Sequence, residues 1–308
     1  MGVLEEKKKA KKLKSVSYNH WGYIFILPFF ITFAIFSLYP MIYSVNLSFT
    51  NLAGWARDYE YVGLYNFRWV WGRELFWRSI GNTLIMWLLN FIPQIFFALF
   101  FAAVFTSISI KMKGKGLFKA LFYFPNLLTA VTVAVLFGTL FAPHGTFHQL
   151  LVSTNIISSD FEIARHVWAT RSIISYIQFF MWFGSTMILL IAAINSISDS
   201  VYEAALIDGS GKIRTFFFIT LPLIKPIMVF VLITAAVSGL QMFDVPLLFA
   251  GGGPSDNTTT VAMYIYRLAF EGQRNYNMAA AASVYVMFLA VGMSIAIRGL
   301  IKLTELKD

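Results

Sequence analysis

Cysteine is absent from the 308 residues of this chain, which excludes disulfides, thiolate metal ligands and thiol nucleophiles. Charge is also scarce, because Asp, Glu, Lys and Arg together make up 13% of the sequence while hydrophobic residues make up 58%. Such a composition does not fit a water-soluble globular protein. We therefore expect a chain that lies in a lipid bilayer.

Long apolar runs recur along the sequence, and six of them reach the roughly 18 to 20 residues that a helix needs to cross a bilayer. The runs are continuous and lack the alternation of apolar and polar residues that is typical of membrane β-barrels. The sequence therefore predicts an all-α, polytopic membrane protein with six transmembrane helices, at residues 23–45, 83–106, 117–141, 173–194, 223–243 and 278–300.

Lysine is distributed unevenly between the predicted loops. It is frequent in residues 1–20 and between Lys111 and Lys119, whereas the loops at residues 46–82, 143–172 and 244–277 carry Arg but no Lys. Basic residues beside short loops are retained on the cytoplasmic side, so both ends of the chain are expected in the cytoplasm. Residues 1–20 then form a basic cytoplasmic tail, which favours contact with anionic lipid over nucleic acid, and residues 21–308 form one transmembrane domain.

The long cytoplasmic loop over residues 198–221 has the pattern of two short helices. Ser200 and Glu203 match a capping box at a helix start, and Gly209 supplies the left-handed residue that ends a helix. Residues 213–221 are apolar enough for a second helix. From these features alone, an ordinary connection and a rigid knob that fits a groove on another protein are equally good interpretations.

Motifs for enzyme chemistry are missing from the sequence. The run Gly209-Ser210-Gly211-Lys212 falls short of a phosphate-binding loop, because Leu206 stands at its first glycine position and Ile213 at its hydroxyl position. His144 and His148 have the spacing of two imidazoles on one helix face, but poor helix formers separate them, so we expect a solvent-facing pair without a metal. We predict no catalytic residue, no metal site and no cofactor in this chain.

The cytoplasmic loop carries the most specific motif. Its sequence Glu203-Ala204-Ala205, Asp208-Gly209 and Ile219-Thr220-Leu221-Pro222 resembles the signature of binding-protein-dependent ABC importer permeases. Other segments resemble the sugar-importing branch, which includes the larger maltose permease subunit and the glycerol-phosphate and multiple-sugar permeases. These segments are Gly63-Leu64-Tyr65-Asn66-Phe67, Phe124-Pro125-Asn126 and Gly252-Gly253-Pro254, and only residues before Tyr18 fall outside the resemblance.

This resemblance implies the type I ABC importer permease fold, located in the bacterial inner membrane. It also implies a second, similar permease as partner, two ATPase subunits that bind ATP and Mg, and an external solute-binding protein. The solute would be a sugar or oligosaccharide, with a polysaccharide fragment or glycerol phosphate also open, and it would pass by alternating access. The residues implied to dock into the ATPase are Glu203, Ala204, Ala205, Asp208, Gly209, Leu221 and Pro222.

Polar residues in the fourth and fifth predicted spans mark a candidate passage, because polar groups in lipid usually face a partner or a pathway. Helical spacing places Gln178, Trp182 and Ser185 on one face, and it groups Ser238, Gln241 and Asp244 in the same way. The same residues would equally serve contact with a second permease. The candidates are Gln178, Trp182, Ser185, Ser238, Gly239, Gln241, Met242 and Asp244, with Asn90 and Gln94 as further possibilities.

Three other classes of protein remain as alternatives, and one of them is a pure scaffold for ATPase subunits. An ion-coupled secondary transporter would usually bury ionisable groups near the middle of the membrane, and the predicted spans contain no such set. A membrane enzyme that acts on a lipid-linked sugar would need a nucleophile or a base, and none stands out in the sequence.

Overall fold

The computed structural model describes residues 19–55, 58–107 and 113–305. Helices dominate these residues, in which no strand forms beyond an isolated bridge between Thr50 and Tyr61. The predicted all-α class is therefore confirmed. The basic tail up to residue 18 and Lys111 lie outside the described residues, so the structure says nothing of them.

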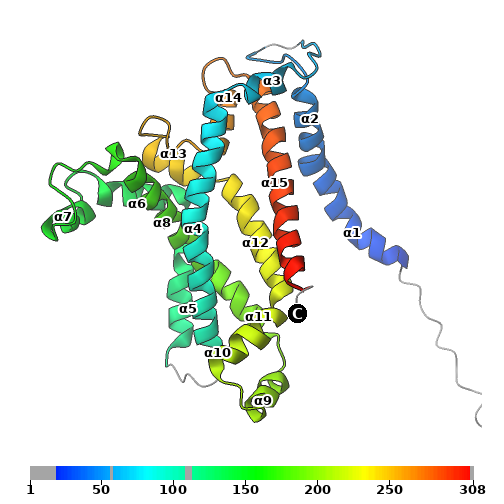
Figure 1. Cartoon of the computed structure of the whole chain (residues 1–308). Helices are drawn as coiled ribbons and strands as arrows, with labels where there is room; N and C mark the ends of the chain where they lie inside the picture. The colour runs from blue at the N-terminus through cyan, green and yellow to red at the C-terminus, as the bar shows by residue number, and fades with distance from the viewer. Residues whose placement is uncertain (1–18, 56–57, 108–112, 306–308) are drawn as a thin grey trace, which may run out of the picture.

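The helices follow one another along the chain as labelled in Figure 1. In order they are α1 (Asn19–Phe33), a π turn (Ala34–Leu38), α2 (Tyr39–Leu47), α3 (Tyr65–Trp71), α4 (Glu74–Thr106), α5 (Lys115–Tyr123), a 3-10 turn (Phe124–Leu127), α6 (Ala130–Phe141), α7 (Thr146–Ser153), a second 3-10 turn (Ile163–Arg165), α8 (Val167–Asn195), α9 (Asp199–Ile207), α10 (Lys212–Thr215), a second π turn (Phe216–Thr220), α11 (Leu221–Leu223), α12 (Lys225–Leu240), α13 (Asp244–Ala250), α14 (Val261–Phe270) and α15 (Tyr276–Glu305).

The described residues contain five helical stretches that are long and apolar enough to cross a membrane, at Trp21–Leu47, Glu74–Thr106, Ala130–Ser153, Val167–Asn195 and Tyr276–Ile301. The pair Lys212–Leu223 and Lys225–Leu240, two helices bent by 71° at their junction, gives a sixth span if it is counted as one. Counted in this way, the number of spans agrees with the predicted six. Short helices also form in all three predicted outer loops, as expected for long connections.

The third predicted span, at residues 117–141, is wrong as a single helix. The apolar run is divided into α5, a 3-10 turn and α6, and Leu128 and Thr129 between them have extended backbone. Pro125 explains the break, because proline lacks the amide proton that would continue the helix. Thr129 then starts α6 by accepting a hydrogen bond from the amide of Thr132.

The fifth predicted span, at residues 223–243, is also shorter than expected. Helix α12 begins at Lys225, with Pro226 in its first turn, and ends at Leu240. Proline is favoured at a helix start because its missing amide proton has no partner there in any case. Residues 241–243 are not helical, so α13 starts a new helix at Asp244 with its own direction.

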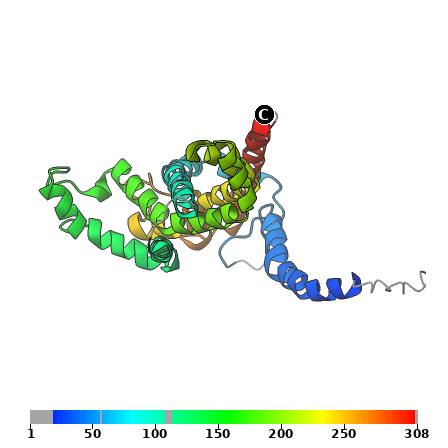
Figure 2. The same cartoon turned by 90° about the horizontal axis from the view of Figure 1, so that it is seen from below.

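The core of the molecule lies where α4 and α8 pack along each other, with α12 and α15 beside them (Figure 1). Met187 and Leu190 of α8 are fully buried in this cluster, together with Ala98 and Ala102 of α4. Helix α1 and the pair α6 and α7 extend away from this core on opposite sides (Figures 1 and 2). In the apolar window of Trp21–Leu47 no residue is buried within the chain.

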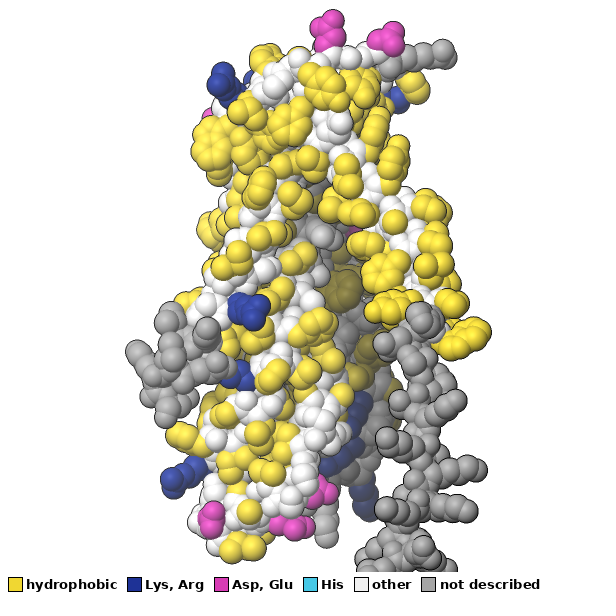
Figure 3. Space-filling view, turned by 90° about the vertical axis from the view of Figure 1, so that its right-hand side faces the viewer, with side chains coloured by type: hydrophobic (Ala, Val, Ile, Leu, Met, Phe, Trp, Pro, Cys, Tyr) yellow, Lys and Arg dark blue, Asp and Glu magenta, His cyan; other side chains and the backbone are white. Residues whose placement is uncertain are grey.

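The surface matches a protein that spans a bilayer. Figure 3 shows hydrophobic side chains spread over the middle of one face, with acidic side chains standing out at its two ends. Exposed apolar residues include Phe96 and Phe100 of α4 and Phe230 of α12. In water such an exposed surface would be unfavourable, whereas in lipid it is expected.

Candidate functional site

A cavity of about 310 Å³ lies between α4, α8 and α12. It is lined by side chains from all three helices, namely Trp87, Asn90, Gln94, Gln178, Trp182, Ser185, Thr186, Leu189, Val231, Thr234, Ala235, Ser238, Gly239 and Met242. The volume lies at the lower end of the range for small-molecule sites. Its wall combines amides, hydroxyls and aromatic rings with aliphatic side chains.

Six of the eight predicted passage residues line this cavity: Gln178, Trp182, Ser185, Ser238, Gly239 and Met242. The α8 residues lie within one unbroken helix, so the spacing argument places them on one face. Gln241 and Asp244 do not line the cavity. Helical spacing does not apply to them, because α12 ends at Leu240.

Helix α4 contributes a third wall of the cavity, which was predicted only in part. Asn90 and Gln94, named there as further possibilities, both line the cavity, and Trp87 joins them. The spacings of three and four residues from Trp87 through Asn90 to Gln94 put all three on one helix face. That spacing was a usable signal for Trp87, which we had not selected.

The amides in the cavity differ in how their hydrogen bonds are satisfied. Gln94 Nε2 donates to Thr186 Oγ1 at 2.9 Å, which ties α4 to α8. Asn90 is 7% exposed, and its Oδ1 has no hydrogen-bond partner among the described residues. A buried amide oxygen without a donor is unfavourable, so the Asn90 oxygen needs a donor that the described residues do not supply.

The Trp87 ring is fixed against α12. Its Nε1 donates to the carbonyl oxygen of Ala235 at 3.1 Å, and the ring stacks on Phe91 with centroids 4.7 Å apart. The ring also lies against the backbone of Gly239, where an added Cβ would come within 2.6 Å of ring atoms Cγ and Nε1. Only glycine at residue 239 therefore allows the ring to lie where it does.

The predicted cytoplasmic element forms a compact knob at the lower end of the molecule, with α9 at its tip (Figure 1). Gly209 has φ of +71° and ends α9, as its sequence position predicted. The amide of Ser210 donates to Ala205 O at 2.9 Å, and that of Gly209 donates to Leu206 O at 3.1 Å. Tyr202 Oη lies 3.3 Å from Thr220 Oγ1, which links α9 to the following helical run.

The predicted capping box at the start of α9 is wrong. Ser198 is the N-cap residue, its side chain makes no capping hydrogen bond, and its Oγ lies 2.8 Å from Ser200 Oγ. Because the helix starts two residues earlier than a cap at Ser200 requires, Glu203 does not fold back and is exposed.

The surface of the knob combines polar and apolar groups. Among the residues named for ATPase docking, Glu203, Ala204, Asp208, Gly209 and Pro222 are exposed, Ala205 is buried and Leu221 is half-buried. Leu206 and Ile207 are 75% and 85% exposed at the end of α9, and the sequence analysis had not singled them out for docking. Two large apolar side chains at the tip of a polar knob are suited to a protein partner.

The two histidines of the outer loop do not form a solvent-facing pair. His148 is buried, and its Nε2 lies 2.9 Å from the carbonyl oxygen of Phe161, which accepts the proton of that nitrogen. His144 is exposed and has φ of +67°. The prediction is wrong for His148 because α7 folds back on the loop that follows it.

The loop over residues 251–260 is fastened across the outer ends of α4 and α8. Arg171 of α8 is 7% exposed, and it donates from Nε to Asn257 O at 2.9 Å and from a terminal nitrogen to Asn82 Oδ1 at 2.6 Å. The Asn82 amide donates in turn to the carbonyl oxygens of Asp256 and Thr259. These contacts hold the loop above the cavity.

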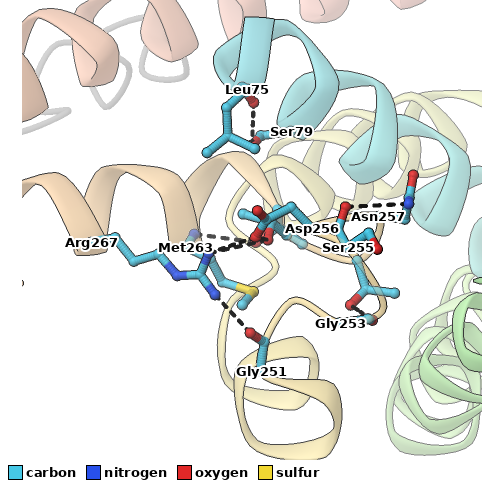
Figure 4. Close-up of polar contacts among 12 residues, drawn as sticks. Leu75, Ser79, Gly251, Gly253, Ser255, Asp256, Asn257, Met263 and Arg267 are labelled. Carbon is cyan, nitrogen blue, oxygen red and sulfur yellow. Dashed lines mark hydrogen bonds and ion pairs between the residues drawn. The ribbon is translucent and has the colours of Figure 1, made fainter. Parts of the chain in front are cut away.

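A charged pair stiffens the same loop from within (Figure 4). Arg267 donates to Asp256 Oδ1 at 2.9 Å and to Gly251 O at 2.7 Å. Burial alone would raise the pKa of the Asp256 carboxyl, but hydrogen bonds from Arg267 and Thr259 outweigh it. The positive charges of Arg267 and Arg78 act in the same direction, so the pKa of Asp256 lies below its ordinary value.

The fold and the site together define a multispan membrane protein with an internal cavity that is lined in part by polar side chains and with a compact helical knob at one end. Residues 82–303 match the family described as "Binding-protein-dependent transport system inner membrane component". The chain belongs to this family. It is also 32% identical over 279 residues to the lactose transport system permease protein LacF of Rhizobium radiobacter, with 90% of this chain and 92% of the relative covered.

Solved structures show the same fold. The crystal structure of a bacterial ABC transporter involved in the import of the acidic polysaccharide alginate contains a chain with a TM-score of 0.77 and 24% identity, covering 94% of this chain and 97% of that one. The bacterial alginate ABC transporter in complex with an alginate pentasaccharide-bound periplasmic protein gives a TM-score of 0.76 and 25% identity, covering 92% and 94%. The predicted ABC importer permease fold is confirmed.

Proposed function

We propose that this chain is one of two permease subunits of an ATP-driven importer that receives a sugar or oligosaccharide from an external binding protein. The observation that carries the proposal is the match to the binding-protein-dependent family over residues 82–303. The sugar class is supported by relatives described as transporting lactose and alginate. The solute moves through the cavity between α4, α8 and α12 as the complex alternates between outward-facing and inward-facing states.

The knob formed by α9 and α10 transmits the work of ATP hydrolysis. Glu203, Asp208 and Gly209 lie at its exposed tip, where Leu206 and Ile207 add apolar surface for a groove on an ATPase subunit. Separate partner subunits bind ATP and Mg, and this chain holds no cofactor of its own. Because the knob leads through a 71° bend into α12, movement of the knob is passed to a wall of the cavity.

The orientation follows from the same assignment. The knob and the carboxyl end of α15 lie at one end of the molecule, and α3, α14 and the loop over residues 251–260 lie toward the other (Figure 1). With the knob in the cytoplasm, the loops that carry Arg but no Lys face outward, as the distribution of lysine predicts. The chain thus lies in the bacterial inner membrane with both ends inside.

A transport assay tests this proposal. The tagged chain is co-purified with its partner subunits from its own bacterium and reconstituted with the binding protein encoded beside it. We expect ATP-dependent accumulation of a sugar, and we expect Glu203→Lys to abolish accumulation while membrane insertion and co-purification of the second permease stay normal. Full ATP-dependent uptake by the Glu203→Lys complex would refute the role of the knob.

The ion-coupled alternative has its own decisive measurement. Vesicles that contain this chain and its permease partner but no ATPase are given a proton or sodium gradient. The importer proposal predicts no accumulation under these conditions, and gradient-driven uptake would establish the alternative.

A further inference from the structure

We propose that the cavity between α4, α8 and α12 selects uncharged carbohydrate, so that this subunit serves a neutral sugar and not an acidic one such as a uronate or a sugar phosphate. The inference rests on the proposed function and narrows its substrate class. Three features of the cavity carry it: the absence of charge, an amide without a partner and an immobilised indole ring.

Charge is missing from the cavity wall. All fourteen lining residues belong to the described part of the chain, and none is Asp, Glu, Lys, Arg or His. A carboxylate or phosphate that leaves water for such a wall loses its hydration without gaining a cation, which is strongly unfavourable. A sugar that offers only hydroxyls loses far less free energy. Polar groups of the wall take the place of the water molecules to which its hydroxyls were hydrogen-bonded.

A nearby cation does not change this conclusion. Arg171 lies on α8 seven residues before Gln178, about 10 Å away along the helix axis. Its guanidinium is not part of the cavity wall, and it donates to Asn257 O and Asn82 Oδ1 instead. Arg171 therefore serves the outer loop and leaves the cavity without a positive charge.

The polar groups of the wall match sugar hydroxyls in kind. Asn90 is more than nine-tenths buried, lines the cavity and has an Oδ1 without a donor among the described residues. The oxygen is shielded in this structure, so a sugar hydroxyl supplies that donor only when the helices around the cavity move during alternating access. Hydroxyls of Ser185 and Thr234 donate to backbone carbonyls of their own helices, which leaves their oxygens free to accept. Ser238 adds another hydroxyl that can donate as well as accept.

Trp87 offers an apolar face for the ring of a neutral sugar. The indole is held by its hydrogen bond to Ala235 O and by its contact with Gly239, so it has lost its side-chain freedom before any solute arrives. Trp182, 49% exposed, faces the cavity from α8. Aromatic rings with few polar groups around them are typical of sites for small, partly apolar ligands. We assign Trp87 as a specificity-determining residue.

The substrate class is tested with the reconstituted complex and its binding protein. Proteoliposomes receive ATP and an equimolar mixture of di- and trisaccharides of neutral hexoses and pentoses, the uronate trisaccharides of the same hexoses, and glycerol 3-phosphate. Mass spectrometry identifies what enters. We expect neutral sugars alone to accumulate. ATP-dependent entry of a uronate or of glycerol 3-phosphate overturns the neutral assignment and leaves the proposed function standing, whereas ATP-dependent entry of no solute refutes the proposed function.

Two variants then test the named residues with the sugar that enters. Trp87→Ala is expected to lower its uptake about tenfold, the loss that corresponds to one aromatic contact. The matched control is Trp77→Ala on the same helix, which lies outside the cavity and is expected to leave uptake unchanged. Unchanged uptake by Trp87→Ala overturns the assignment of Trp87.

The Asn90→Leu variant provides a second test of the cavity. Its result does not depend on whether the Trp87→Ala variant folds. The change replaces an unpaired buried amide by an apolar group of similar shape, which does not destabilise a protein when no ligand is bound. We expect about fivefold to tenfold lower uptake with an unchanged or higher melting temperature. Unchanged uptake overturns a role of Asn90 in binding.

Discussion

Substitution of Gly239 by alanine tests the packing that shapes the cavity. A methyl group at residue 239 would overlap the Trp87 ring, since the added Cβ would lie 2.6 Å from Cγ and Nε1. The overlap is too large for the ring to stay in place. We therefore expect Trp87 to move and to lose its hydrogen bond to Ala235 O.

The magnitude follows from three contributions. Forcing an extra methyl group into a packed site costs about 1–3 kcal/mol, and losing the Trp87 hydrogen bond costs about 1 kcal/mol. Alanine is the better helix former by about 1 kcal/mol, which offsets part of this loss. The net effect is about 1–3 kcal/mol of destabilisation, or about 5 °C in melting temperature by the scaling known for large domains.

The assay measures thermal unfolding of the purified complex and uptake of its sugar in parallel. Gly239→Ala is expected to lower both, with uptake about tenfold lower because the Trp87 face is displaced. The matched control is Gly292→Ala on α15, where an added Cβ would meet nothing within 4 Å and where stability should hold or rise. A Gly239→Ala complex with unchanged melting temperature and uptake would show that Trp87 does not rest on Gly239.

Three further changes test other parts of the molecule. Gly209→Val forces a β-branched residue to φ of +71°. This change is expected to abolish the stimulation of ATP hydrolysis by the loaded binding protein. Asparagine tolerates this backbone conformation, so Gly209→Asn should retain part of that stimulation. Thr186→Val leaves the buried Gln94 amide without its partner and is expected to lower stability by about 1–3 kcal/mol, measured by thermal unfolding. Because the pKa of Asp256 is lowered by folding, its contact with Arg267 stabilises the outer loop at neutral pH and is lost as the pH falls below the ordinary value of 3.8. Hydrogen exchange of residues 251–260, corrected for intrinsic rates, should rise in that range, and in Asp256→Asn it should already be raised at pH 7.

The spans could be predicted from the sequence to the extent that length and apolar content decide them. The second, fourth and sixth predicted spans fall within α4, α8 and α15, because a long apolar run has few other ways to satisfy its backbone in lipid. The third prediction was wrong because mean hydropathy does not register a single proline, and the fifth ran three residues past the end of α12. Pro125 and Pro226 were visible in the sequence and mark the positions where α6 is separated from α5 and where α12 begins.

The docking knob was predictable because its signals are local. At the end of α9 the amide of Gly209 donates to Leu206 O, three positions before it, and the amide of Ser210 donates to Ala205 O, five positions before it, so a short stretch of sequence determines the corner. The start of α9 was misjudged by two residues, since Ser198 and Ser200 are both acceptable caps by residue type. Only the surrounding backbone selects between them.

The cavity was predictable only in part because it depends on contacts between distant segments. Helical spacing brought Gln178, Trp182 and Ser185 together within α8, but it carries no information across the end of α12. The contact of Trp87 with α12 joins residues about 150 positions apart, since its hydrogen-bond partner Ala235 lies 148 residues further along the chain. Glycine is frequent in membrane helices in general, so Gly239 alone gave no sign of which ring it admits.

The sequence also left open whether these polar residues line a passage or seal a contact with a second permease. Asn90 supports the first interpretation. A sealed contact within the chain would have given its oxygen a donor, as Thr186 gives Gln94 an acceptor one turn further along α4. A second permease that supplied the missing donor would make Asn90→Leu weaken association of the two permeases and leave sugar selectivity unchanged. If a passing sugar supplies the donor instead, Asn90→Leu should change the handling of the sugar and leave association of the two permeases unchanged. Co-purification and uptake measured on this one variant therefore separate the two roles.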